Sequence, residues 1–447
     1  MDDTVLPSKL LTTLSQAADI VNGRNFIHVY SHYDADGITS AAIIAKTLLR
    51  AGKEFKVTLF TSLNDENMRI IRETPSECII ITDLGASYIE QLDALKCDVV
   101  VLDHHTVEKQ AKRVCYANPH LYGIDGMTSG CGATMSFLFA ITMSSVNWDL
   151  VQLAFAGIAG DRQHINGLKG LNIYLYEGGL ERGHIKVMEG SMIPPGQLTS
   201  ELYLSTDPYI KGVSGDAEGV AALLDSASIG RERFYKDLTE DERRRLSSLI
   251  ALKLMEQGTS MQTLFELSRT RYYLKDWNTD AETLGSLLNG CGRLGLGGVG
   301  VSAGIGDKKS LSQAEELENT SKSQLMDGVL SLQKNGLNQM ENIQWFDSSE
   351  LGFTGMICGI AMQFMGDPSK PTIGINRSDG IAKISSRATF GLLDKGVDLS
   401  SALKEACASV GGNGGGHRIA SGGSCLTERS DEFLSNLDVI VGKQLHK

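Results

Sequence analysis

Four short clusters of acidic and histidine residues follow apolar runs in the first third of the chain. In sequence order they are SHYDADG (31–37), TDLG (82–85), LDHH (102–105) and AGDR (159–162). Carboxylates gathered in one cleft cannot all stay ionised without compensating positive charge, and the first three clusters contain no Lys or Arg. Divalent cations are the expected source of that charge. Oxygen and imidazole donors without thiolates suit Mn²⁺ or Mg²⁺ better than a structural zinc ion, and a pair of such ions suits phosphoryl chemistry.

The segments that precede the clusters explain how these side chains would meet. The runs 25–30, 78–82 and 97–102 are rich in Ile, Val and Phe and predict buried strands, with helical patterns between them. This alternation predicts a parallel α/β sheet, in which ligands bind at the carboxyl ends of the strands. Asp161 would join the site from the end of the helical run 151–159. The ligand-type side chains expected at the strand ends are His32, Asp34, Asp36, Asp83, Asp103, His104 and His105.

Each cluster taken alone has a simpler explanation. An Asp that follows a strand, such as Asp36 or Asp83, is often only the N-cap of the next helix. His104 alone would more often be a core or loop histidine than a ligand. Four clusters that all carry ligand-type residues at predicted element ends favour the shared metal site.

Together the four clusters resemble the DHH phosphoesterase superfamily, which is named for the triplet found here as Asp103-His104-His105. The resemblance implies that Asp103 orients His104 and that His105 faces the scissile phosphate. It also implies two cations, Mn²⁺ or Mg²⁺. Their ligands are then His32 and Asp34 for one, Asp36, His104 and Asp161 for the other, and Asp83 for both.

A second signature lies near the end of the sequence. The segment GGNGGGHRIASGG (411–423) resembles the glycine-rich loop of the DHH-associated substrate-binding domain, and KISSRA (383–388) resembles the strand before it. Glycines let backbone amides approach phosphate oxygens closely. Taken alone, the glycine run would predict only a mobile surface loop, and Arg387 a solvated charge. The substrate-binding residues that the resemblance implies here are Arg387, Gly414, Gly415, Gly416 and His417.

A third segment, LLNGCGRLG (287–295), narrows the resemblance. It is similar to a segment of RecJ-type exonucleases whose arginine contacts a phosphate of the nucleic acid, which here implies Arg293. Gly290 and Cys291 replace two alanines of that pattern, so the requirement for small residues is still met. The resemblance is to the RecJ-like branch of archaeal type and covers residues 25–190 and 275–425.

Composition bounds the class of protein. A chain of 447 residues predicts two to three domains, and its net charge of −12 argues against coating duplex nucleic acid through bulk electrostatics. We expect a cytoplasmic protein without a membrane segment, because no apolar stretch is long enough for a membrane helix and the first ten residues lack a signal-peptide pattern. The eight cysteines include no CxxC pair and are expected to be reduced core residues.

The expected fold is α/β with four parts. Residues 1–190 form a DHH catalytic domain with a parallel sheet and helices on both faces, and residues 191–275 form a helical insertion. Residues 276–342 form a linker region with the phosphate-contact segment and a long helix at 311–335. Residues 343–447 form a smaller α/β DHH-associated domain, with strands expected at 356–362 and 372–376.

The function expected from the residues and the resemblance is a RecJ-like, metal-dependent exonuclease that acts on the ends of single-stranded DNA or RNA in replication or repair. One alternative is a nanoRNase or cyclic-dinucleotide phosphodiesterase. Another is a replication-fork scaffold that binds a GINS-like complex, although the intact ligand set argues against a purely structural role. The helical insertion lies outside the matched segments, so we expect it to serve length discrimination or partner docking. Strand polarity, DNA or RNA preference and processivity stay open.

Overall fold

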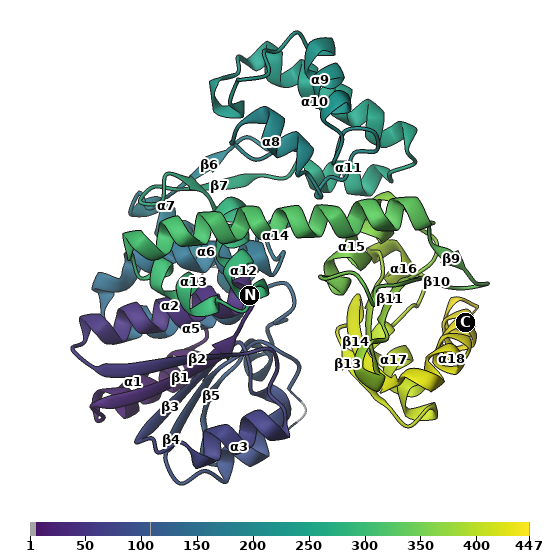
Figure 1. Ribbon diagram of the computed structural model, residues 1–447. Coiled ribbons are helices and arrows are strands. Elements are labelled where there is room, and N and C mark those ends of the chain that lie inside the picture. The colour runs from purple at the N-terminus through teal and green to yellow at the C-terminus, as the bar shows by residue number, and fades with distance from the viewer. Residues whose placement is uncertain (1–5, 108, 447) are drawn as a thin grey trace. The chain divides into compact units, whose positions relative to one another are not determined.

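The computed structural model of the chain describes residues 6–107 and 109–446. The chain divides into two compact units, the first of Met1–Gly190 with Arg269–Ser321 and the second of Ser191–Ser268 with Lys322–Lys447. The division falls within helix α14 (Lys308–Asn335), so residues of this one helix belong to both units (Figure 1). The expected four-part division of the chain stays a prediction.

The first unit is built on a sheet of five parallel strands in the order β2-β1-β3-β4-β5. The strands are β1 (Phe26–His32), β2 (Glu54–Phe60), β3 (Cys78–Thr82), β4 (Asp98–Leu102) and β5 (Cys115–Ala117). The predicted strands are β1, β3 and β4, and the predicted parallel α/β fold is confirmed. β2 and β5 were not predicted.

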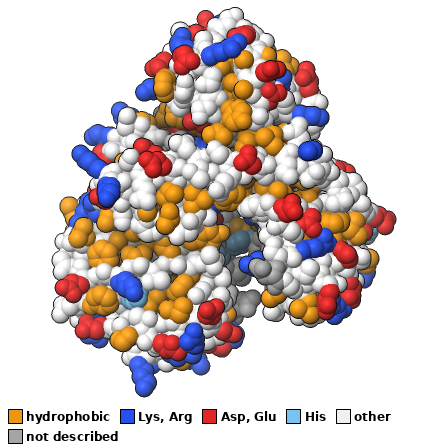
Figure 2. Space-filling view, viewed as in Figure 1, with side chains coloured by type: hydrophobic (Ala, Val, Ile, Leu, Met, Phe, Trp, Pro, Cys, Tyr) orange, Lys and Arg blue, Asp and Glu red, His pale blue; other side chains and the backbone are white. Residues whose placement is uncertain are grey.

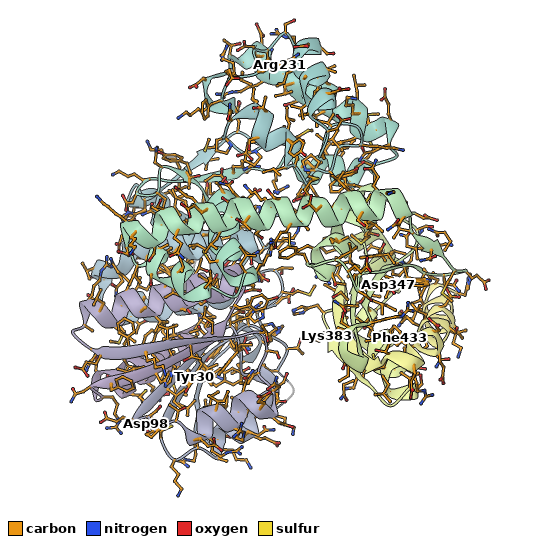
Figure 3. All side chains as sticks on the ribbon, viewed as in Figure 1. Tyr30, Asp98, Arg231, Asp347, Lys383 and Phe433 are labelled. Carbon is orange, nitrogen blue, oxygen red and sulfur yellow. The ribbon has the colours of Figure 1, made fainter. Side chains whose placement is uncertain are left out.

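Helices cover both faces of this sheet. Successive side chains along a strand point to opposite faces, so the buried strands contribute apolar side chains to a core on each face. In β1, Ile27 and Val29 join the core on one face, whereas Tyr30 packs in the core on the other (Figure 3). The helices of the first face are α1 (Ser8–Asn22), α2 (Ala35–Arg50), α5 (Gly132–Met143) and α6 (Val151–Gly160). The helices of the second face are α3 (Asp65–Glu73) and α4 (Ile89–Asp93).

The strand order changes direction at β1, which has β2 on one side and β3, β4 and β5 on the other. In open α/β sheets such a switch point leaves room for a ligand outside the carboxyl ends of the strands. The first three acidic clusters follow β1, β3 and β4 and therefore lie at this edge.

The first unit also contains the segments that leave and re-enter it around residues 191–268. β6 (Ile185–Met188) pairs with β7 (Arg271–Leu274), which pairs with β8 (Thr279–Asp280), and all pairs are antiparallel. After β8, helix α12 (Ala281–Arg293) packs against α6 and α2. The remaining helices of this unit are α7 (Leu171–Glu181) and α13 (Gly297–Gly304).

The second unit begins with helices. They are α8 (Leu198–Tyr203), α9 (Ala217–Ser226), α10 (Glu240–Glu256) and α11 (Met261–Leu267). A capping box of Thr239 and Glu242 starts α10. The buried side chains Leu246 of α10, Val329 of α14 and Ile357 lie in one hydrophobic core. The inserted helices therefore share a core with the C-terminal region instead of forming a separate lobe.

The C-terminal region is a mixed sheet of six strands in the order β13-β14-β12-β11-β10-β9. Its strands are β9 (Asn338–Gln339), β10 (Gln344–Asp347), β11 (Thr372–Asn376), β12 (Ile381–Arg387), β13 (Asn413–Gly416) and β14 (Ala420–Leu426). Its helices are α15 (Thr354–Phe364), α16 (Phe390–Asp394), α17 (Leu399–Ser409) and α18 (Ser430–Leu445). Phe433 of α18 packs in the core that Ile373 and Ile375 of β11 form with α17 (Figure 3). Figure 3 also locates Lys383 on β12.

One predicted strand is wrong. Residues 356–362 lie within helix α15, whereas the strand predicted at 372–376 is β11. The run MICGIAM is apolar throughout, and a short continuous apolar run fits a buried helix as well as a buried strand. Ile357, Cys358 and Ala361 are buried at helical spacing. Packing in the core of the second unit therefore determines that this segment is a helix.

The visible surface carries both signs of charge. Figure 2 shows Lys and Arg side chains interspersed with Asp and Glu side chains rather than gathered into one patch. Within the described residues, no helix is both long enough and apolar enough to cross a membrane.

Candidate metal centre

The first cluster lies where β1 ends and α2 begins. Asp34 is the N-cap of α2, since its Oδ1 accepts the Gly37 N–H at 3.0 Å. Its Oδ2 lies 3.0 Å from Nδ1 of His32, the last residue of β1. Gly37 has to be small, because a Cβ there would lie 2.3 Å from the His32 carbonyl oxygen. The capping role and the site role therefore belong to the same carboxylate.

Asp36 is buried in the first turn of α2 and faces the N-terminus of α5. Its Oδ2 accepts the Gly132 N–H at 2.7 Å and its Oδ1 accepts the Ala133 N–H at 2.8 Å. These donors and the helix dipole favour a negative charge there. Burial nevertheless raises the pKa of Asp36 well above its ordinary value, and the nearby carboxylate of Asp83 adds to the rise.

Asp83 follows β3 and connects the two halves of the cluster. Its φ of 55° lies in the left-handed region, which a non-glycine residue seldom adopts and which is common at functional sites. Its Oδ2 lies 3.6 Å from Nδ1 of His32 and its Oδ1 lies 3.2 Å from Nε2 of His104. Burial opposes ionisation, but the hydrogen bonds of these two imidazoles hold the pKa of Asp83 well below its usual range.

His104 follows β4 and is fixed from behind by a backbone carbonyl. Its Nδ1 lies 2.8 Å from the Gly126 oxygen, so Nε2 faces Asp83 at 3.2 Å and Asp36 at 3.8 Å. Asp161, at the end of α6, lies 3.8 Å from the ring through its Oδ2. Burial raises the pKa of Asp161 to about 6, with His104 opposing the rise and Asp83 adding to it.

The Asp103 side chain lies at the ring of His105, and not at the ring of His104 that it was expected to orient. Its Oδ1 lies 2.7 Å from Nδ1 of His105, whereas the ring of His104 is held by Gly126. Asp103 touches His104 only through the backbone N–H, at 2.8 Å. Burial acts against charging His105, but Asp103 raises the pKa of this imidazole above its ordinary value. The Asp103 carboxylate therefore bonds the ring of His105 and the backbone of His104.

These side chains form three groups whose donor atoms lie within 4.8 Å of one another. The groups are His32 with Asp34 and Asp83, Asp83 with His104 and His105, and Asp36 with His104 and Asp161. Oxygen and imidazole nitrogen donors suit Mn²⁺ or Mg²⁺. Buried carboxylates that raise each other's pKa also indicate that positive charge is needed in this place. The residues present therefore fit divalent cations.

Arg293, at the end of α12, lies beside this cluster. A Cβ at its neighbour Gly292 would fall 1.7 Å from the carbonyl oxygen of Tyr33, so glycine lets α12 approach the first cluster. Burial lowers the pKa of Arg293 to about 10, while Tyr33 and Asp34 act in the opposite direction. The phosphate contact expected of Arg293 stays a prediction.

The other expected substrate residues lie in the second unit. Segment 411–423 is a β-hairpin, not the expected loop, and contains Gly414, Gly415 and Gly416 in β13 and His417 in the turn before β14. Arg387 is opposite Ala420 in the register of β12 and β14. A Cβ at Gly414 would lie 2.7 Å from the Leu403 carbonyl oxygen, whereas one at Gly415 would meet no described atom within 4 Å. Gly414 therefore allows the close packing of β13 against α17.

Two residues beside the candidate metal ligands were not predicted from the sequence. Gly126 supplies the carbonyl that holds His104, and Gln163 contacts both this carbonyl, at 2.8 Å, and Asp161, at 2.7 Å. Neither residue is a usual metal ligand. The only signal was the place of Gln163 two residues after Asp161.

Comparisons with known proteins match two parts of the chain to family models. Residues 26–158 match the N-terminal domain of the DHH family, and residues 349–443 match the DHHA1 domain. An uncharacterised protein of Methanocaldococcus jannaschii is 30% identical over 437 residues, which cover 96% of each chain. The chain belongs to the DHH phosphoesterase family.

Two solved structures share the fold of this DHH-family chain. RecJ from Thermus thermophilus, in complex with Mn²⁺, has a TM-score of 0.61 at 15% identity and covers 98% of this chain. The chain spans about half the length of that RecJ, 55%. CDC45 from Entamoeba histolytica has a TM-score of 0.65 at 11% identity, and the match covers 97% of this chain and 99% of CDC45. The fold is therefore RecJ-like.

Proposed function

We propose that this DHH-family protein is a metal-dependent exonuclease that hydrolyses phosphodiester bonds at the end of single-stranded nucleic acid in DNA replication or repair. The observation that carries the proposal is the reach of Asp83, whose two carboxylate oxygens face His32 on one side and His104 on the other. A carboxylate in this position can serve two cations at once, as two-metal phosphoryl chemistry requires.

The proposed cofactor is a pair of Mn²⁺ ions, with Mg²⁺ as the substitute. When bound, they supply Lewis-acid activation of water and of the phosphoryl group. Mn²⁺ is proposed because the similar RecJ from T. thermophilus is a Mn²⁺ complex. The proposed ligands are His32 and Asp34 for one ion, Asp36, His104 and Asp161 for the other, and Asp83 for both.

His105 is the proposed donor to the reacting phosphate. Its Nδ1 is held by Asp103, and its side chain is 39% exposed, so the ring is accessible from solvent while its orientation is fixed. Because Asp103 raises the pKa of His105, the imidazole can carry the proton that stabilises a phosphate oxygen or the leaving group.

Substrate contacts are proposed for Arg293 in the first unit and for Arg387, His417 and the glycines Gly414–Gly416 in the second. A few placed arginines suit a protein whose net charge is −12, because such a protein has to bind a strand locally. A GINS-like replication protein is the proposed protein partner, on the resemblance of the sequence alone.

The test is a digestion series with DNA and RNA oligonucleotides, from dinucleotides to long strands, labelled at either end and incubated with Mn²⁺, Mg²⁺ or EDTA. The proposal predicts stepwise removal of terminal nucleotides from long single strands with Mn²⁺ and none in EDTA. Cleavage restricted to dinucleotides would favour the nanoRNase or cyclic-dinucleotide phosphodiesterase alternative. Absence of cleavage at every length, with Mn²⁺ bound, would favour the scaffold alternative.

A further inference from the structure

Gln163 lies at the centre of a buried hydrogen-bond network next to the metal cluster. It follows α6, where the Gln163 N–H donates to the Ile158 carbonyl at 3.0 Å and Arg162 adopts a φ of 57°. These features fix the backbone in the manner of a helix C-cap. The Gln163 side chain is 4% exposed, so every polar atom in it needs a protein partner.

The carboxamide of Gln163 has a partner for each of its four hydrogen-bonding positions. Its Nε2 donates to Asp161 Oδ2 at 2.7 Å and to the Gly126 carbonyl at 2.8 Å. Its Oε1 accepts the Gly130 N–H and the Asn172 Nδ2–H, both at 2.9 Å. A flipped amide would turn donors toward donors and acceptors toward acceptors, so the network determines the orientation of the group.

The two acceptors of Nε2 lead to two proposed ligands of the same cation. Asp161 is one of them, and the Gly126 carbonyl holds the other, His104, through Nδ1 at 2.8 Å. Position 126 has to be glycine, because a Cβ there would lie 2.1 Å from the His104 carbonyl oxygen. Gln163 therefore contacts one of these ligands directly and reaches the other through the carbonyl that holds its ring.

On the other side, the network reaches the helix that binds Asp36. Asn172 Oδ1 accepts the Thr134 hydroxyl at 2.7 Å, and Thr134 lies on α5, whose first N–H groups bind Asp36. The Gln163 network and the Asp36 carboxylate therefore meet at the same helix, α5.

We propose that Gln163 is a positioning residue that holds Asp161 and His104 in the arrangement needed to bind the cation that they are proposed to share with Asp36. The inference rests on the proposed metal-dependent function. It predicts that changing Gln163 weakens one of the two cation sites and spares the site of His32 and Asp34. Partners that orient metal ligands in this way typically contribute about 10- to 100-fold to metal affinity.

The test compares Gln163→Glu with Gln152→Glu in the full chain. Gln163→Glu keeps the size of the side chain but turns a carboxylate oxygen toward Asp161 and the Gly126 carbonyl. Gln152 offers a matched control because it is also buried, at 1% exposure, and also donates its amide to a carboxylate, that of Asp276, at 2.6 Å. Mn²⁺ binding is measured by calorimetric titration and by the electron paramagnetic resonance of bound Mn²⁺, and unfolding is measured in EDTA.

The expected result is a loss of affinity of about 10- to 100-fold for one of two Mn²⁺ in Gln163→Glu, with the other Mn²⁺ retained and both retained in Gln152→Glu. Wild-type affinities in Gln163→Glu would overturn the inference while leaving the metal-dependent function intact. Equal losses in both variants would also overturn it, because the effect would then reflect general destabilisation. A wild-type chain that binds no Mn²⁺ would overturn the proposed function as well.

Discussion

Asp161→Asn is expected to stabilise the metal-free protein at neutral pH while weakening its binding of Mn²⁺. Folding raises the pKa of Asp161 from 3.8 to about 6, with burial as the main cause, His104 opposing and Asp83 and Asp34 adding. When folding raises the pKa of an acid, the native state binds the proton more tightly than the unfolded state does. The protein therefore loses stability as the pH rises from the unfolded to the folded pKa of that acid. The cost is therefore absent below pH 3.8 and fully present above pH 6.

The size of the Asp161 pKa shift gives the expected change in the free energy of unfolding. A rise from 3.8 to about 6 corresponds to about 3 kcal/mol in favour of the neutral acid. The Asp161 side chain is 31% exposed, so solvent screening reduces the expected gain to about 1–2 kcal/mol. In a unit of this size that gain raises the unfolding midpoint by about 2–8 °C. An asparagine oxygen can still accept the hydrogen bond from Gln163, so the fold is retained.

The assay is thermal unfolding in EDTA and in Mn²⁺ at several pH values from 4 to 8. In EDTA the variant should become more stable than the wild type as the pH rises toward about 6, and in Mn²⁺ the order should reverse, since ligand binding adds about 2.7 kcal/mol at a hundred times Kd. Asp149→Asn is the control, since Asp149 is 34% exposed but paired with Arg50 at 2.6 Å. It should lose stability and keep its response to Mn²⁺. A variant that is less stable than the wild type in EDTA at pH 7 would refute the reasoning.

Three further outcomes are expected. Asp103→Asn should lower kcat at least about tenfold while leaving Mn²⁺ affinity unchanged, because this carboxylate bonds the ring of His105 at 2.7 Å; a loss of bound metal would contradict the assignment. Arg293→Ala should weaken single-strand binding and leave the Mn²⁺ stoichiometry unchanged. It should also reduce by about 1 the slope of the logarithm of the binding constant against the logarithm of the salt concentration, whereas Arg293→Lys should keep the slope. Equal slopes in the wild type and both variants would exclude a phosphate contact. Leu246→Ala should destabilise the second unit by about 2–4 kcal/mol, because this fully buried side chain packs in the core shared with α14 and α15; hydrogen exchange that speeds up equally in the first unit would contradict this.

The grouping of the candidate metal ligands could be predicted from the sequence because these residues are local to strand ends. His32, Asp83 and His104 each follow a buried apolar run, and parallel strands bring their carboxyl ends to one edge of the sheet. The strand β2 was harder to predict, because it is less buried than β1 and includes the exposed residues Glu54 and Lys56.

The parts that the sequence did not predict depend on long-range contacts. Helix α15 was expected as a strand because the pattern of its apolar run does not distinguish the two, and its partners in the core of the second unit are distant in sequence. The ring of His105, not that of His104, contacts Asp103, because the Gly126 carbonyl already holds His104. Gln163 is not a usual metal ligand, so its residue type gave no signal. Its proposed role depends on where Gly126 and Asn172 lie in the fold.

The central claim is that six side chains, Asp83 among them, hold two divalent cations, and anomalous diffraction from a crystal of the full chain soaked in Mn²⁺ tests it most directly. The account predicts two Mn²⁺ peaks, one beside His32 and Asp34 and the other beside Asp36, His104 and Asp161, with Asp83 contacting both. The same soak of an Asp83→Asn crystal should lose at least one peak. A single peak that Asp83 does not contact, or peaks only at other surface carboxylates, would contradict the two-cation assignment.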